Sequence, residues 1–228
     1  MGALGRPRLH VRSIGSTNDR LRELVAAGAP HGTLVTAGEQ TAGRGRQGRG
    51  WSTPAGEALA MSLLVREPPP LLSLVAAVAV VDAIGDEAEI KWPNDVLVGG
   101  RKVAGILVEA RGGGHGLDWA IVGIGVNVAV SSLPEGLRET AASLQRSPAD
   151  VEPFLAALLA ALERRLASAD AELLDAWRAR DALRGRRVEW NGGEGTAAGI
   201  DDAGRLLVKL DAGGTAALDA GEVHLRRS

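Results

Sequence analysis

The sequence predicts a chain of mixed α and β structure that ends in a small antiparallel β module. Up to about residue 183, segments with a helical spacing of apolar residues alternate with short, strand-like apolar segments. One of these, 119–128, is almost wholly apolar, as is typical of a central strand. After Leu183 only short alternating runs remain, separated by turns that contain glycine. We therefore expect two domains, residues 1–183 and residues 184–228.

The first part of the larger domain contains two predicted helices and two predicted strands. The first helix begins at Ser16, which can form a capping box with Asp19, and it ends near Gly28. Strands are expected on either side of a glycine-rich segment, at 33–37 and 58–65. After three prolines, the alanine- and leucine-rich segment 71–84 predicts a largely buried helix.

The middle of the chain reads as a series of strands. A short strand, 89–92, leads into Pro93, and the residue before a proline is restricted to extended geometry. The sequence therefore predicts a strand end followed by a sharp turn. Segments 96–98 and 101–111 have the pattern of a β-hairpin, and 119–128 follows them as the central strand.

Two helices and the small β module complete the chain. A long helix is predicted from about residue 150, where leucines recur at helical spacing, and a second helix over about 171–180. Five short strands are expected in the module, at 187–190, 196–200, 206–210, 215–218 and 223–225.

Charge and composition exclude several classes of protein. The chain of 228 residues carries 26 basic and 28 acidic residues, a near-neutral balance that argues against a general nucleic-acid-binding protein. The absence of cysteine excludes disulfides, thiolate metal sites and cysteine nucleophiles. The N-terminus lacks the apolar core of a signal peptide, and no run of about 18 apolar residues occurs. We expect a cytoplasmic protein with no membrane partner.

The segment Gly43–Trp51 is the most informative part of the sequence. It places Arg44, Arg46 and Arg49 among glycines and ends on an indole. Glycine lets the backbone bend closely around a ligand, and the arginine fork fits phosphate or carboxylate. Disordered nucleic-acid-binding tails have a similar composition, but a position between two predicted strands favours a ligand loop. The segment therefore predicts a mobile cationic clamp for a small anion.

Other candidate site residues lie at strand ends. Lys91–Asp95 places a cation, an amide and a carboxylate at one turn, although an ordinary surface turn uses the same residue types. Lys102 begins a predicted strand, where a solvated edge lysine is the alternative, and Gly105 suits the close approach of a ligand. Asn127 offers donors and an acceptor that match the edge of adenine, or simply ends its strand.

Taken in order, these segments closely resemble bacterial biotin–protein ligases over about residues 9–228. The resemblance rests on Ser16-Thr17-Asn18, Gln40, the Gly43–Trp51 segment, Lys91–Asp95, Lys102–Glu109 and Gly125-Val126-Asn127. It implies a mixed sheet with helices, related to class II aminoacyl-tRNA synthetases, followed by a small barrel resembling a Src-homology-3 domain. Some family members begin with a DNA-binding domain. The matching region starts near residue 9 here, so we expect a monofunctional ligase with no DNA partner.

The resemblance implies an ATP-dependent reaction in two steps. Biotin is activated as biotinyl-5'-AMP, and the biotinyl group then passes to a lysine of a biotin carboxyl carrier domain. That domain would belong to acetyl- or acyl-CoA carboxylase or to pyruvate carboxylase. Biotin, ATP and Mg²⁺ are the expected ligands. A lipoate or octanoate ligase of related fold is the alternative.

Residues that match the family's motifs take their expected roles from the resemblance. The implied catalytic residues are Arg46, Lys91, Asp95 and Lys102. The implied biotin-binding residues are Ser16, Thr17, Asn18, Gln40, Gly43, Arg44, Lys102 and Gly105. The implied ATP- or adenylate-binding residues are Arg46, Arg49, Trp51, Asn94, Lys102 and Asn127. Asp95 would either help to bind Mg²⁺ or accept a proton from the incoming lysine.

Overall fold

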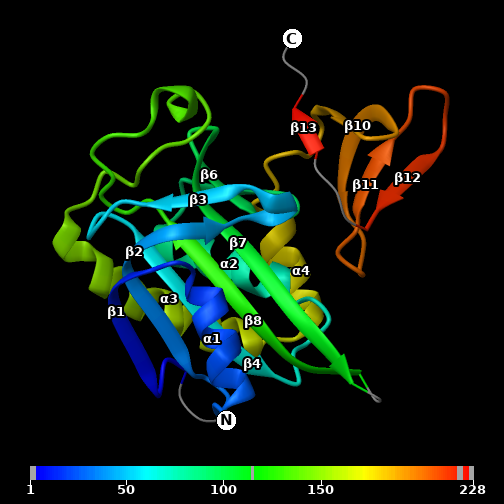
Figure 1. Cartoon of the computed structure of the whole chain (residues 1–228). Helices are drawn as coiled ribbons and strands as arrows, with labels where there is room; N and C mark the ends of the chain where they lie inside the picture. The colour runs from blue at the N-terminus through cyan, green and yellow to red at the C-terminus, as the bar shows by residue number, and fades with distance from the viewer. Residues whose placement is uncertain (1–3, 114–115, 220–222, 226–228) are drawn as a thin grey trace.

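The fold consists of a large mixed sheet with helices on both faces and a smaller C-terminal sheet (Figure 1). A computed structural model describes residues 4–113, 116–219 and 223–225. The observed architecture confirms the predicted fold class of a mixed sheet with helices. No helix in the described part of the chain is long and apolar enough to cross a membrane.

The large sheet has eight strands in the order β1-β2-β4-β8-β7-β6-β5, with β3 paired to β2. Its strands are β1 (Arg8–Ile14), β2 (Leu34–Arg44), β3 (Gly50–Thr53), β4 (Leu59–Arg66), β5 (Ala88–Lys91), β6 (Asp95–Val98), β7 (Arg101–Gly113) and β8 (Gly116–Val126). The β1–β2 pair is parallel, and the other pairs are antiparallel. As its apolar sequence predicts, β8 is central, with β4 on one side and β7 on the other.

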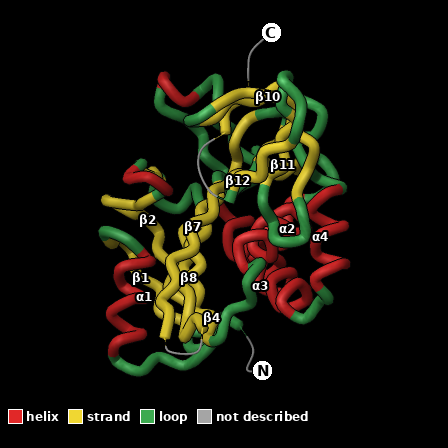
Figure 2. The backbone as a smooth tube through the Cα atoms, turned by 90° about the vertical axis from the view of Figure 1, so that its right-hand side faces the viewer, coloured by secondary structure: helices red, strands yellow, loops and turns green. Residues whose placement is uncertain are grey.

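Four helices cover the two faces of this sheet: α1 (Thr17–Ala26), α2 (Leu72–Ile84), α3 (Val151–Leu166) and α4 (Asp170–Arg178). Figure 2 shows α1 on one face and the other three helices on the opposite face. Leu21 of α1 packs against Val35, Leu64 and Ile121, whereas α2–α4 belong to the larger core cluster. A helix that is apolar all round must be buried, and nearly every residue of α2 is.

The capping box predicted for α1 is wrong. Ser16 has the extended backbone of an N-cap residue, but its side chain makes no capping hydrogen bond. The carboxylate of Asp19 instead accepts hydrogen bonds from Arg22, one helical turn along, and from Arg44 of β2. A hydrogen bond between a guanidinium and a carboxylate carries charge on both partners, and here it takes the place of the cap.

The C-terminal residues form a five-stranded antiparallel sheet in the order β12-β11-β10-β9-β13. Its strands are β9 (Arg187–Trp190), β10 (Gly193–Ile200), β11 (Leu206–Lys209), β12 (Thr215–Leu218) and β13 (Val223–Leu225), which confirms all five predicted strands. The two edge strands, β12 and β13, are not paired with each other in the described residues. A closed barrel and a domain boundary at residue 183 therefore stay predictions.

Candidate active site

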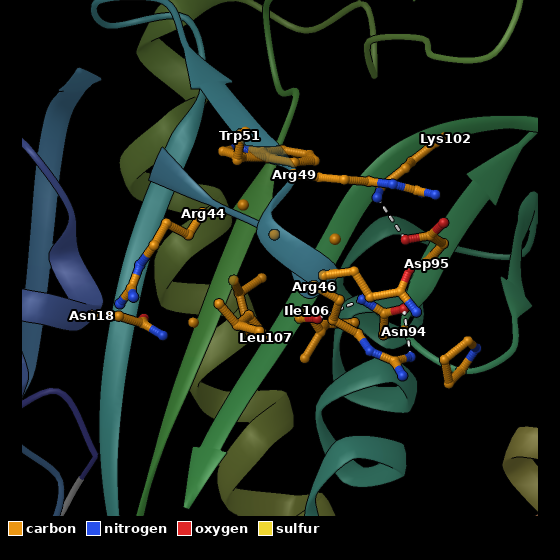
Figure 3. A pocket seen from close by; sticks show the side chains of 18 of the residues that line it. Asn18, Arg44, Arg46, Arg49, Trp51, Asn94, Asp95, Lys102, Ile106 and Leu107 are labelled. Atoms are coloured by element: carbon orange, nitrogen blue, oxygen red, sulfur yellow. Dashed lines mark hydrogen bonds and ion pairs between the residues drawn. The ribbon is translucent and has the colours of Figure 1, made fainter. Parts of the chain in front are cut away.

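One cavity brings together most of the residues that the sequence singles out (Figure 3). They come from the start of α1, the β2–β3 hairpin, the β5–β6 turn and β7. The predicted site residues that line it are Ser16, Thr17, Asn18, Gln40, Arg44, Arg46, Arg49, Trp51, Lys91, Asn94, Asp95, Lys102 and Gly105. The cavity thus unites segments that are far apart in the sequence.

A buried polar network lies under one side of this cavity. The backbone N–H and the hydroxyl of Thr17 both donate to Gln40 Oε1, at 2.8 and 3.0 Å. Ser62 of β4 is fully buried, and its hydroxyl oxygen lies 2.7 Å from Thr17 Oγ1 and within hydrogen-bonding distance of Asn18 Oδ1. Buried polar groups without partners are costly, so this network holds its members in fixed positions.

Sequence reasoning missed Ser62. The available signal is that it is the single hydroxyl in a strand whose other residues from Leu59 to Val65 are apolar and buried. A lone polar residue in such a strand requires a buried partner. The sequence does not show that the partners are Thr17 and Asn18.

Charged side chains surround the polar network of Thr17 and Asn18 on the same side of the cavity. Asn18 Nδ2 donates to Glu109 at 2.7 Å, and Arg22 forms ion pairs with both Asp19 and Glu109. The hydrogen bond from Arg22 to Asp19 raises the pKa of the Arg22 guanidinium. Arg44 reaches Asp19 at 2.6 Å, so this cavity residue is held against α1.

The Gly43–Trp51 segment is a β-hairpin rather than a loop between two strands. Strand β2 extends into it as far as Arg44, and β3 begins at Gly50, so the predicted strand limits are wrong here. A hydrogen bond of 2.7 Å from Gly45 N–H to Arg49 C=O closes the turn, and Gln47 has a left-handed φ of 56°. The mobility of the segment stays a prediction.

The indole of Trp51 lies against a pair of glycines. Gly105 of β7 and Gly125 of β8 are cross-strand partners, and a Cβ on Gly125 would lie 2.3 Å from Trp51 Cε2. A Cβ on Gly105 would lie 3.2 Å from Trp51 Cζ3. The Trp51 side chain can therefore lie here only because residue 125 is a glycine, and the glycine at position 105 gives the ring further room. Lys102 Nζ lies 5.4 Å from the ring centroid, within cation–π range.

Cations and acceptors gather at the other side of the cavity. Lys102 Nζ lies 2.6 Å from Asp95 Oδ1, and Arg46 donates to Asn94 Oδ1 at 3.4 Å. Asn94 is fixed to β7, because its Nδ2 donates to Ile106 C=O at 2.7 Å. Fixed positive charges of this kind can offset the repulsion between two anionic reactants.

The described residues contain no group of three or more histidine, aspartate or glutamate side chains placed to hold a metal ion. Asp95 is the carboxylate among the cavity residues, and its side chain is 23% exposed. One carboxylate suits Mg²⁺ only where substrate phosphates complete the coordination.

Two family models match this chain. A model of the "Biotin/lipoate A/B protein ligase family" matches residues 11–127, more than half of the chain, and one of the "Biotin protein ligase C terminal domain" matches residues 185–226. The chain belongs to the biotin/lipoate A/B protein ligase family.

Relatives of this ligase-family chain span much of its length. The biotin--[acetyl-CoA-carboxylase] ligase of Mycobacterium tuberculosis is 38% identical over 95% of this chain and 88% of that protein. The Paracoccus denitrificans ligase of the same name is 40% identical over 87% of this chain and 92% of that protein. The bifunctional ligase/repressor BirA of Bacillus subtilis is 40% identical over 63% of this chain. That match, like the one to Bacillus spizizenii BirA, spans about half (48%) of the relative's length.

Solved structures of family members have the same fold. The biotin protein ligase of Aquifex aeolicus in complex with biotin and ATP superposes with a TM-score of 0.83 and 29% identity, covering 98% of this chain and all of that one.

Two residues to which the family resemblance gives a ligand contact lie outside the cavity. Asn127 is buried, and its Nδ2 donates to Ala142 C=O at 2.9 Å, which ties the end of β8 to the segment that follows; its contact with adenine stays a prediction. Gly43 is needed for strand pairing, because a Cβ there would lie 2.4 Å from Trp51 C=O. The cavity lining also includes residues that the sequence did not indicate, among them Met61 of β4 and Val223 of β13 in the C-terminal sheet.

Proposed function

We propose that this protein is an ATP-dependent ligase that activates biotin as biotinyl-5'-AMP and transfers it to a lysine of a biotin carboxyl carrier domain. The observation that carries the proposal is one cavity with a buried polar network at Thr17 and a cationic group at Lys102 and Arg46. The names of full-length relatives and the ligand-bound Aquifex aeolicus structure support it. A carboxylase would supply the carrier domain. The reaction would take place in the cytoplasm, with no DNA or membrane partner.

In the first step, an oxygen of the biotin carboxylate attacks the α-phosphorus of ATP, and the bond to the β-phosphate breaks to release pyrophosphate. Lys102 and Arg46 would offset the negative charge of the two reactants, with Lys91 and Arg49 nearby in the cavity lining. Ser16, Thr17, Gln40 and Arg44 would bind the biotin head, and Trp51 would pack near the adenine.

The cavity residues fit Mg²⁺ that is bound as its complex with ATP, because the phosphate oxygens then supply ligands that the protein does not. Asp95 would supply one carboxylate oxygen, beside the amide oxygen of Asn94. When bound, Mg²⁺ would supply positive charge to the phosphates.

In the second step, the amine of the carrier lysine attacks the biotinyl carbonyl carbon, the bond to AMP breaks, and the amine loses a proton. A free lysine has a pKa of about 10.4, so removal of that proton needs help at neutral pH. Asp95 is the candidate acceptor if it does not hold Mg²⁺.

The test is incubation with biotin, Mg²⁺-ATP and a purified biotin carboxyl carrier domain. We expect one biotinyl group on one carrier lysine by mass spectrometry, and none without ATP. A lipoate or octanoate ligase is the competing function. Calorimetric titration with biotin, lipoate and octanoate separates the two, and preference for a long-chain acid without a ureido ring would overturn the proposal.

Substitution Ser62→Ala should weaken biotin binding by about tenfold, because one lost hydrogen bond in a buried network is worth roughly 1–1.5 kcal/mol. The change removes the hydroxyl that lies between Thr17 and Asn18 without adding volume. Calorimetry measures the effect, with Ser13→Ala on the exposed face of β1 as the control. Equal biotin affinity in the two variants would exclude Ser62 from the binding site.

The Gly43–Trp51 hairpin should become more ordered when biotin or biotinyl-5'-AMP binds. Fixing about eight residues costs on the order of 8–16 kcal/mol of backbone entropy, which contacts with ligand must offset. Closure would also keep water away from a hydrolysable anhydride. Hydrogen exchange of the amides in 43–51 should slow when ligand is added. Full protection in the unliganded protein would contradict this expectation.

A further inference from the structure

The C-terminal sheet contributes to the cavity as well as to the fold. Val223 of β13 is almost fully buried and lines the same cavity as Lys102. In Figures 1 and 2 this sheet lies far from α1, which carries Thr17 and Asn18. Any influence of the sheet is therefore expected at the cationic side of the site rather than at the Thr17 network.

A buried indole connects the two parts of the chain. Trp92, between Lys91 and Pro93, is 2% exposed, and its Nε1–H donates to Gly204 C=O at 3.1 Å. Gly204 belongs to the turn between β10 and β11. The hydrogen bond thus joins the C-terminal sheet to the turn that carries Lys91, Asn94 and Asp95.

The turn that accepts this hydrogen bond is firmly built. The carboxylate of Asp201 accepts the backbone N–H groups of Ala203 and Arg205 at 3.0 and 2.9 Å, and Gly204 N–H donates to Asp201 C=O. Gly204 has a φ of +78°, and a Cβ there would lie 3.0 Å from Leu74 Cδ1 of α2. The position of Gly204 C=O is therefore fixed by the hydrogen bonds of the turn and by the packing of the turn against α2.

The chain between the two parts makes a second connection to the same place. Ile90, the penultimate residue of β5, donates its N–H to Arg180 C=O at 2.7 Å and accepts from Ala182 N–H at 3.0 Å. Two connections thus hold the end of β5. Residues 180–182 bind its backbone, and Gly204 binds the indole of Trp92.

We propose that the C-terminal sheet positions the Lys91–Asp95 turn for the nucleotide step, and that Trp92 is the positioning residue through which it acts. Trp92 also lines the cavity, but its side chain is 2% exposed and its N–H is bound to Gly204 C=O, so it would act through the turn rather than on the reacting atoms. Its hydrogen bond fixes the angle at which the turn presents Asn94 and Asp95 to Arg46 and Lys102. This role rests on the proposed adenylation of biotin.

The test is Trp92→Phe, which removes the N–H donor and keeps an aromatic ring. We expect the KM for ATP in pyrophosphate release to rise about tenfold, as for the loss of one buried hydrogen bond, with kcat also reduced. Biotin affinity by calorimetry should stay within about twofold, because the Thr17 network is untouched. Trp190→Phe on β9 is the matched control and should leave both quantities unchanged.

A second pair of variants tests the sheet side. Gly204→Ala should give the same rise in the KM for ATP, because its Cβ would press on Leu74. Gly213→Ala has a similar positive φ, +92°, but open space around the added Cβ, so it controls for backbone strain alone. All measurements are made well below the melting temperature of each variant.

The outcomes are distinct. A lower melting temperature with normal KM for ATP in Trp92→Phe would overturn the positioning role and leave Trp92 as a core residue. Equal losses of biotin and ATP affinity would also overturn it, since the effect would then be global. An unsubstituted protein that forms no biotinyl-5'-AMP would refute the proposed function itself, and this role with it.

Discussion

Substitution Lys102→Ala is expected to slow the formation of biotinyl-5'-AMP by roughly a hundred- to a thousandfold, the range typical of removing one preorganised charge from a transition state. Lys102 Nζ lies between Asp95, at 2.6 Å, and the Trp51 ring, at 5.4 Å from the centroid. Among the described residues no other ammonium group is placed in this way, since Lys91 lines the cavity but forms no ion pair with Asp95 and no cation–π contact with Trp51. Pyrophosphate release measured with saturating biotin and ATP reports the step directly.

Two comparisons make the Lys102 result interpretable. The fold should survive, because a partly exposed ion pair contributes little to stability, so the melting temperature should change by only a few degrees. Lys209→Ala, an exposed lysine on β11, removes the same charge away from the cavity and should release pyrophosphate at the normal rate. A normal rate in Lys102→Ala as well would remove this residue from the catalytic group.

The segments that sequence analysis predicted well are those whose function depends on local chemistry. Apart from Ser73 and Asp82, the segment 71–84 is apolar, so its burial follows largely from composition, and the structure confirms the helix as α2. The cationic segment and the Lys91–Asp95 turn were recognised from residue types a few positions apart, and the structure brings both to one cavity.

The wrong capping prediction has a physical cause, which is competition from other side chains. The carboxylate of Asp19 binds Arg22, one helical turn along, and also Arg44, on a strand that begins eight residues after the helix ends. Asn127 likewise uses one amide N–H on Ala142 C=O, a partner 15 residues along the chain, while its adenine contact stays a prediction. The local sequence does not reveal such competitors.

The same limit explains what was missed. Ser62 has its two partners on α1, and Val223 reaches the cavity only because the C-terminal sheet docks beside β5 and α2. Docking of one sheet on another part of the chain depends on the shape of both surfaces, which residue patterns do not encode locally.

Substitution Arg46→Gly is expected to speed the dissociation of biotinyl-5'-AMP by roughly ten- to a hundredfold. Two effects add. The variant loses a charged donor to the ligand phosphate, worth about 1.5–3 kcal/mol for a hydrogen bond to a charged group. It also loses the contact of Arg46 Nη1 with Asn94 Oδ1, which joins the hairpin tip to the β5–β6 turn across the cavity. Chase of labelled biotinyl-5'-AMP with an excess of unlabelled compound gives the dissociation rate.

Gln47→Gly separates these effects from the extra backbone freedom that glycine brings. Gln47 already has a φ of 56°, a conformation that glycine adopts without strain, so this variant changes the adjacent position without removing a cation. Fast dissociation in Arg46→Gly but not in Gln47→Gly assigns retention of the adenylate to the guanidinium. Equally fast dissociation in both would assign it to the stiffness of the hairpin. An unchanged rate in Arg46→Gly would show that the hairpin does not retain the adenylate through this arginine, and the clamp would then have to act through Arg44 or Arg49.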